Sequence, residues 1–174
     1  MTKHRAAFAA LSLFLLPAAA TFAQEMPREG KFSITYTGVN PSPAKPVTFG
    51  KDHDAIVGVS LMTAVNDAGS GLLHNMAGRC IVLTMIDRAV KTFDMRSWCN
   101  YADRSGDQIF EEVSTPAGTG LGAPAKFIGK WTGGTGKFVG LAGEFEVTNS
   151  GNIGSDGVFQ ATGKKTGTYR FEKQ

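Results

Sequence analysis

Glu111 and Glu112 form an acidic pair in the middle of the chain and are candidates for chemistry. They belong to Gln108 to Ser114, whose alternating residues are typical of a β-strand, so the two carboxylates should point to opposite faces. One of them must then face inward if the strand is part of a barrel. A buried carboxylate has a raised pKa and can act as an acid, a base or an anchor for a ligand. A position at a barrel mouth, or a salt bridge with Arg96 or Arg104, is the alternative.

Aromatic residues and one arginine of this region could line a ligand pocket, because small barrels can hold one small ligand. The candidate ligand-binding residues are Trp98, Arg96, Glu111 and Trp131. Arg96 could bind an anionic group. The alternative is that the aromatic residues form core and that Arg96 extends toward solvent. Glu111 and Tyr101 are the candidates for a catalytic role, but no complete catalytic set is evident.

The chain lacks the common motifs for nucleotide binding, hydrolysis and metal binding. In the glycine-rich run from Gly129, Trp131 and Phe138 stand where a Walker loop needs a glycine and a hydroxyl. No G-x-S-x-G nucleophile motif occurs. Asp103 to Asp107 lacks the further oxygens and the terminal glutamate of a calcium loop, and is predicted to be a hairpin turn. The sequence therefore predicts neither a cofactor nor a metal site.

Cys80 and Cys99 are the two cysteines of the chain, and their surroundings predict a disulfide. Arg79 to Asp87 and Thr92 to Tyr101 are strand-like and are joined by a short link. In a hairpin with this link, Cys80 lies opposite Cys99 and within disulfide range. Loop closure by this bond would stabilise the fold by about 3 kcal/mol. A reactive or metal-binding thiol pair is the alternative, but no CxxC spacing or nearby histidine supports it.

Residues 1–23 have the three-part pattern of a secretory signal peptide, with small residues that allow cleavage near Ala23. Their apolar run is shorter than a membrane span needs, and no later segment is long enough, so no membrane span is predicted. Loss of this basic start lowers the formal net charge from +3 to +1, and no basic block remains. We therefore expect a periplasmic or secreted protein with one domain, residues 24–174, and no nucleic-acid partner.

Short strands separated by regular turn residues fill residues 24–174, and no stretch has a convincing helical period. This pattern predicts an all-β sandwich or barrel. Several strands are apolar on both faces, as in Arg79 to Asp87, and such strands need cover on both sides. A barrel interior can cover one face, and a second subunit can cover the other, so a homo-oligomer is one interpretation.

The run Gly129 to Gly140, with the closing Gly143 to Glu146, resembles the glycine-rich strand pair of the allene oxide cyclase and dirigent protein group. It is also similar to small secreted bacterial proteins with a D-x-x-G-D turn, here Asp103 to Asp107. The resemblance implies an eight-stranded antiparallel barrel of the calycin type. No catalytic residue is carried over, because the cyclase chemistry of the group relies on an interior set of residues that has no match here.

The sequence thus predicts an all-β, calycin-like eight-stranded barrel with one disulfide. The first interpretation of its function is a binding module for a small apolar or anionic ligand. The second is a cyclase or isomerase that confines its substrate, with Glu111 or Tyr101 as the polar group. The third is a structural or assembly protein that uses an outer apolar face.

Overall fold

Eight antiparallel strands close into a barrel in the computed structural model, which describes residues 26–43, 45–122 and 126–173. The strands of the barrel are β1 (Glu29–Val39), β3 (His53–Asn66), β4 (Met76–Asp87), β5 (Thr92–Ala102), β6 (Gln108–Ser114), β8 (Lys126–Gly134), β9 (Leu141–Ile153) and β10 (Phe159–Phe171). They follow the order β1-β10-β9-β8-β6-β5-β4-β3, and β1 pairs with β3 to complete the circle. The predicted all-β eight-stranded barrel is confirmed, and the predicted signal peptide lies outside the described residues.

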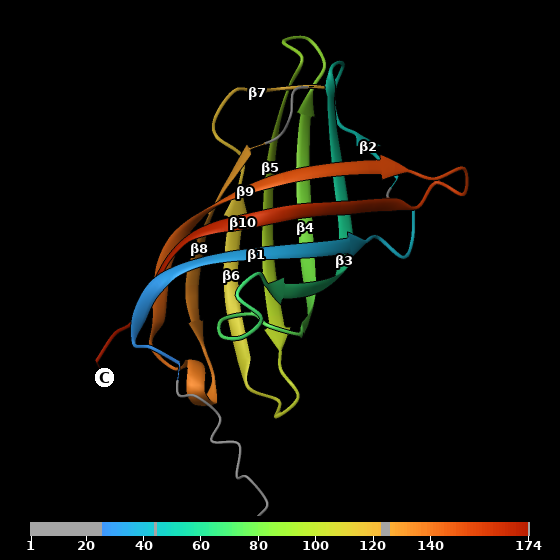
Figure 1. The fold of residues 1–174 in the computed structure, drawn as a ribbon. Helices are drawn as coiled ribbons and strands as arrows, with labels where there is room; N and C mark the ends of the chain where they lie inside the picture. Colours follow the sequence, from blue (N-terminus) through green and yellow to red (C-terminus); the bar gives the residue numbers. More distant parts are fainter. Residues whose placement is uncertain (1–25, 44, 123–125, 174) are drawn as a thin grey trace, which may run out of the picture.

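The barrel is strongly twisted, so its two sides run in different directions (Figure 1). β1, β9 and β10 cross the front of the view, while β3, β4 and β5 run steeply behind them. Two short strands, β2 (Val47–Thr48) and β7 (Thr119–Gly120), add to β3 and β5 outside the closed circle. Closure leaves every long strand paired on both sides, which removes exposed strand edges.

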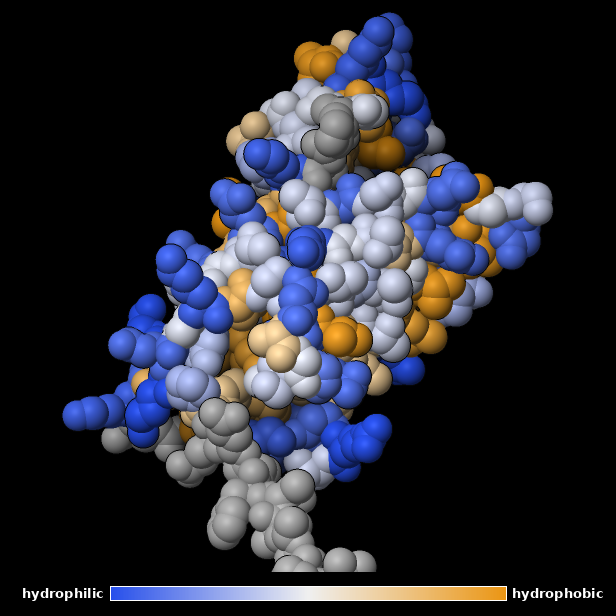
Figure 2. All heavy atoms as spheres, viewed as in Figure 1, coloured by the Kyte–Doolittle hydropathy of each residue, from blue (hydrophilic) through white to orange (hydrophobic). Residues whose placement is uncertain are grey.

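Alternation along each strand divides the side chains between the interior and the surface. In β1, Phe32, Ile34 and Tyr36 are buried, as the sequence predicts, and Ser33 and Thr35 between them point away from the core. The face made by β1, β9 and β10 is mostly blue and pale, with orange patches between and beside these residues (Figure 2). The buried residues of the interior form one hydrophobic cluster.

Inward-facing glycines make room for large aromatic residues on the neighbouring strands. Gly129 and Gly167 both lie opposite Phe145, and a Cβ atom at either glycine would overlap that side chain. In the same way, Gly163 lies opposite Tyr36, and Gly78 lies opposite Tyr101. An eight-stranded barrel has little interior width. The aromatic side chains therefore fit only because their cross-strand partners have no side chain.

One end of the barrel is closed by the loop between β3 and β4. The sequence suggests that the chain from Leu72 to Met76 returns as a strand, but residues 67–75 form turns and β4 begins only at Met76. Leu72 and Leu73 are fully buried, and the Asn66 amide donates a hydrogen bond to the Leu72 carbonyl oxygen at 2.9 Å. The two leucines thus fill the end of the barrel instead of extending its wall.

β10 also differs from the sequence expectation, which places a turn at Gly163 to Lys165. The strand instead runs unbroken from Phe159 to Phe171. Gly163 and Lys165 face the interior and Lys164 faces solvent, so the apparent turn residues follow ordinary strand alternation. Tyr36 requires a glycine at position 163, and this requirement explains a residue that is otherwise typical of turns.

The predicted cysteine hairpin is confirmed. β4 and β5 pair with Cys80 opposite Cys99, and a disulfide joins them. The same register places Ile81 opposite Trp98 and Leu83 opposite Arg96 on the outer face. Both sulfurs therefore lie on the inner face of the barrel.

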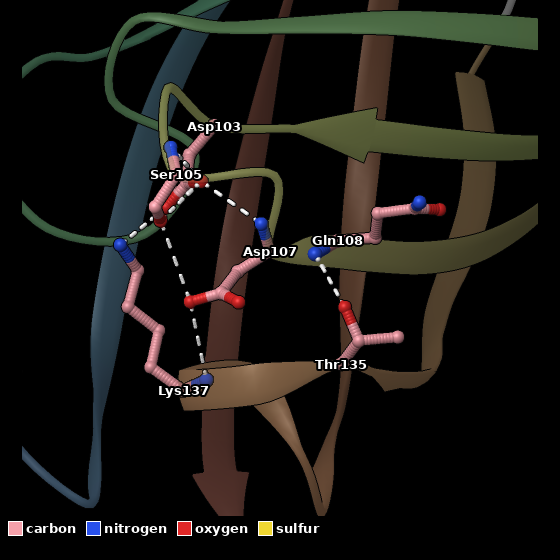
Figure 3. A network of polar contacts seen from close by, with 6 residues as sticks. All are labelled: Asp103, Ser105, Asp107, Gln108, Thr135 and Lys137. Carbon is pink, nitrogen blue, oxygen red and sulfur yellow. Dashed lines mark hydrogen bonds and ion pairs between the residues drawn. The ribbon is translucent and has the colours of Figure 1, made fainter.

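The acidic segment between β5 and β6 forms the turn that the sequence predicts (Figure 3). Asp103 Oδ1 accepts hydrogen bonds from the backbone N–H groups of Ser105 at 2.8 Å and Asp107 at 3.0 Å. Lys137, in the 3₁₀ helix Gly136–Phe138, forms an ion pair with Asp103. These contacts hold the turn against the segment that follows β8, so its carboxylates have structural partners.

Candidate functional site

Four polar side chains from four strands meet inside the barrel. Lys165 of β10 forms an ion pair with Glu111 of β6, and its Nζ donates a hydrogen bond to Tyr101 Oη at 3.0 Å. Tyr36 of β1 lies beside them, with its ring centroid 5.4 Å from Lys165 Nζ. Lys165 and Glu111 are each only 2% exposed. This is a buried ion pair with two phenols next to it.

Strand register explains how Glu111 reaches this place. Glu111 lies opposite Cys99 on β5 and opposite Trp131 on β8. The pairing of β6 with β8 shifts between Phe110 and Glu111. Such a shift is typical of a β-bulge, which bends a strand and can redirect a side chain. Ile109, Glu111 and Val113 all remain buried, so the carboxylate takes an ordinary inward position in an apolar row.

Aromatic faces surround the ammonium group of Lys165. Its Nζ lies 4.7 Å from the Tyr101 ring centroid and 5.5 Å from the Phe145 ring centroid, in addition to the Tyr36 contact. Aromatic faces attract cations, and the Glu111 carboxylate adds a full opposite charge. Burial lowers the pKa of Lys165, and Glu111 acts against this shift. The enclosure by three rings and a carboxylate favours the ionised pair.

The two phenols stay protonated at physiological pH. Burial and the nearby Glu111 charge raise the pKa of Tyr101 well above its ordinary value, and the same causes raise the pKa of Tyr36. A neutral Tyr101 can accept the Lys165 hydrogen bond at its oxygen while keeping its own proton. Tyr101 therefore positions the ammonium group.

A cavity of about 410 Å³ begins at this ion pair and extends through the half of the barrel away from Leu72 and Leu73. Its wall is mostly apolar and includes Val82, Met95, Val113, Phe127 and Val147. Lys165, Glu111 and Tyr36 also line it, whereas Tyr101 stands behind them. The lining reaches the exposed Ile153 near the β9–β10 hairpin, so the cavity opens toward that hairpin. This volume falls in the range of small-molecule sites.

Two oxygen atoms at the cavity have no hydrogen-bond partner among the described residues. They are Glu111 Oε2 and Asn149 Oδ1, and both are buried from solvent. Both residues line the cavity. Buried polar atoms are nearly always hydrogen-bonded in folded proteins, since an unpaired one is costly. These oxygens therefore offer acceptors to a molecule inside the barrel.

The other candidate residues from the sequence do not join this group. Trp98 is 46% exposed, and Arg96 also lies on the outer surface, beside a separate hollow that Phe49 and Glu112 line. Trp131 is buried but does not line the cavity, because it packs against Phe145 at 4.4 Å between ring centroids. Among the four candidate ligand-binding residues, the structure places Glu111 at the cavity.

The outward member of the acidic pair has a surface role. Glu112 points away from the interior and forms an ion pair with Lys130 at 3.0 Å. The sequence could pair the carboxylates only with Arg96 or Arg104, which lie near in the chain. The structure pairs both glutamates with lysines from other strands, Lys130 and Lys165.

Lys165 and Asn149 are the site residues that the sequence analysis misses. Lys165 stands in a stretch that looks like a turn, and Asn149 stands near the end of a strand where polar residues are common. A signal does exist, because Val147 and Asn149 share one face of β9, and Lys165 and Gly163 share one face of β10. Finding it requires knowing that β9 and β10 continue past those positions.

The sulfurs of Cys80 and Cys99 and a carboxylate oxygen of Glu111 lie within 4.8 Å of one another, a grouping that could be mistaken for a metal site. The disulfide occupies both sulfurs, and thiolates are the form that binds metals. The grouping in this state leaves one carboxylate, which Lys165 already neutralises. It does not fit a metal ion.

Comparison of the chain with protein-family models, with curated proteins and with solved structures finds no match. The part of the chain that the structure describes contains no helix long and apolar enough to cross a membrane. The function is therefore inferred from the geometry of the barrel.

Proposed function

We propose that this protein binds a small, partly apolar molecule inside its barrel. The observation that carries the proposal is the cavity of about 410 Å³, with mostly apolar walls and a buried polar group, Lys165 and Glu111, at its inner end. Ligand sites commonly combine apolar walls with a few fixed polar groups that set orientation. The ion pair and the disulfide hold this end of the cavity in shape.

A fluorescent apolar reporter, N-phenyl-1-naphthylamine, tests the proposal directly. We expect one molecule to bind per chain, with enhanced emission, and native mass spectrometry should show the same stoichiometry. Val82→Trp should abolish binding by filling the cavity, because Val82 lines it. Ile81→Trp is the matched control, since Ile81 is 55% exposed on the outer face of the same strand. Failure of the wild-type protein to bind the reporter would refute the proposal.

The expected location follows from the same features. A disulfide persists in an oxidising compartment, which supports a periplasmic or secreted protein. We also retain, as a proposal, the likeness to the allene oxide cyclase and dirigent group, which rests on the glycine-rich residues Gly129 to Gly140. Purification of the protein from periplasm and from culture medium would test the location.

A confining isomerase is the second candidate function. It is favoured by the contact of Lys165 with both Glu111 and Tyr101 at the inner end of the cavity, because Lys165 and Glu111 line the cavity and could move a proton on a bound substrate while Tyr101 positions Lys165. Such an enzyme should lose turnover in Glu111→Gln and in Tyr101→Phe. Unchanged turnover in both variants would remove these residues from the mechanism.

An assembly role is the third candidate and rests on the outer face of β3, β4 and β5. This face exposes large apolar side chains that neighbour one another in the strand register, including Val57, Val59, Ile81, Met85 and Trp98. Exposed apolar patches commonly mark interaction surfaces. Light scattering after size-exclusion chromatography tests the role. We expect an oligomer that Ile81→Glu dissociates, and a wild-type monomer would contradict it.

A further inference from the structure

We infer that the ligand of the barrel is a neutral molecule with an apolar body and a hydroxyl group, and that the hydroxyl donates a hydrogen bond to Glu111 Oε2. The inference rests on the proposed ligand-binding function and specifies its ligand class. Three observations carry it: the paired charges at the cavity, the Glu111 oxygen Oε2 without a partner among the described residues, and the nature of the cavity wall.

The cavity already has balanced charge. Lys165 and Glu111 are the only charged residues among the described residues that line it, and they pair with each other. A ligand anion would lie beside the Glu111 carboxylate, and a ligand cation beside the Lys165 ammonium, with no third charged residue among the described lining to balance it. Either one would bring an unbalanced charge into a poorly solvated place, which is costly. A neutral ligand avoids this cost.

The unpaired oxygen of Glu111, Oε2, needs a hydrogen-bond donor. Lys165 bonds to Oε1, and Oε2 has no partner among the described residues. An ionised carboxylate only accepts hydrogen bonds, so a ligand carbonyl or ether oxygen cannot satisfy Oε2. A hydroxyl can donate its proton to this oxygen without carrying charge. Hydrogen bonds to charged groups are also stronger than those between neutral groups.

Asn149 is a second polar residue of the cavity lining. Its Oδ1 is likewise unpaired among the described residues. Either end of the Asn149 amide can bond a hydroxyl, because a hydroxyl both donates and accepts hydrogen bonds. The lining also includes Asn40 and Ser60, which hydrogen-bond to each other, and the hydroxyl residues Thr84 and Ser97, but most of its surface is apolar, as in Met95, Val113 and Phe127. A ligand with one polar end and an apolar body matches this distribution.

Two isomers of C8H18O give a matched test, 1-octanol and 1-methoxyheptane. They have the same formula and similar length, but the ether lacks a donor. Each competes with bound N-phenyl-1-naphthylamine, and isothermal titration gives the dissociation constants. We expect 1-octanol to bind roughly ten to one hundred times more tightly, as suits a hydrogen bond to a buried charged group. Octanoate and octylammonium should compete less well than 1-octanol.

Substitution of the ion pair tests the role of Glu111. Lys165→Met/Glu111→Leu replaces both charges by apolar groups, which proteins commonly tolerate. We expect this variant to bind the ether and to lose the preference for the alcohol. The control, Lys164→Met/Glu112→Leu, changes the neighbouring outward residues and should keep the preference. Asn149→Leu provides an independent variant at the cavity and should reduce the preference severalfold, whether or not the double variant folds.

The outcomes separate this inference from the proposed function. Equal binding of the two isomers, or tighter binding of octanoate or octylammonium than of 1-octanol, would overturn the neutral hydroxyl ligand and leave the binding function standing. An unchanged preference in Asn149→Leu together with an unchanged preference in the folded double variant would also overturn it. A wild-type protein that binds neither reporter nor isomers refutes both.

Discussion

Lys165 and Glu111 meet inside the barrel although their strands are not hydrogen-bonded neighbours. β9 and β8 lie between β10 and β6 in the order of the sheet, so the ion pair joins two separated parts of the wall. Each residue is 2% exposed, and each neutralises the buried charge of the other. The pair is therefore a structural link as well as the inner end of the cavity.

Removal of one partner should be costly. In Lys165→Met the buried Glu111 side chain loses its counterion and hydrogen-bond donor, so we expect a loss of about 3–5 kcal/mol in the free energy of unfolding. Urea denaturation measures it. Lys164→Met is the control, because Lys164 pairs with Asp67 at the surface and such pairs contribute little. Equal losses of unfolding free energy in the two variants would show that the buried pair stabilises the fold no more than the surface pair.

Gly129→Ala should destabilise the protein by about 1–3 kcal/mol, as overpacked cores commonly do. The new methyl group would overlap the Phe145 ring. Phe145→Leu in the same chain should relieve much of the overlap, so the double-mutant cycle should show favourable coupling. Gly120→Ala, where a Cβ meets nothing within 4 Å, should have little effect. Additive losses at positions 129 and 145 would contradict this packing relationship.

Asp67 should make the protein sensitive to acid. Ser33 and Thr35 donate hydrogen bonds to its carboxylate, at 2.5 and 2.8 Å, and together with Lys164 they hold its pKa at about 2. A pKa below the unfolded value of 3.8 means that this stabilisation is complete above about pH 4 and disappears as the pH falls toward 2. Asp67→Asn should flatten the dependence of unfolding free energy on pH over this window. Titration of the wild-type carboxyl near 3.8, followed by NMR, would disprove the hydrogen-bonded state.

The disulfide should protect the fold strongly and resist reduction. Loss of the Cys80–Cys99 bond in a double alanine variant should cost about 3 kcal/mol, from the entropy of the loop that it closes. Both sulfurs are buried on the inner face, so dithiothreitol should reduce them slowly in the folded protein and rapidly in denaturant. Thiol labelling over time, with and without urea, measures the two rates. Equally fast reduction in both conditions would contradict the buried placement.

The sequence predicts the barrel wall well where a short link joins two strands or where inward and outward residues alternate. The β4–β5 hairpin has its predicted register from Cys80 and Cys99 to Ile86 and Phe93. β6 has its predicted limits, Gln108 and Ser114. In both cases a period of two and short turns determine the local structure without help from distant residues.

The sequence is less informative about the interior. Gly163 and Lys165 look like turn residues, and only the Tyr36 ring and the Glu111 carboxylate, both from distant strands, explain why they face inward. Trp98 and Arg96 look suitable for a pocket, but the inward disulfide of the same hairpin sends them to the outer face. Which face of a two-sided apolar strand lies inside depends on barrel closure, and a local pattern does not contain that information.

The leucine-filled end of the barrel determines which part of a ligand the barrel contacts. Leu72 and Leu73 leave the side near Ile153 as the entrance, so a molecule that reaches Glu111 must arrive head first and leave its tail at the mouth. The barrel then contacts the whole head group, but only the part of the tail next to it. Homologues of one alcohol that differ in chain length should gain affinity until the tail emerges into water, and should thereafter bind alike.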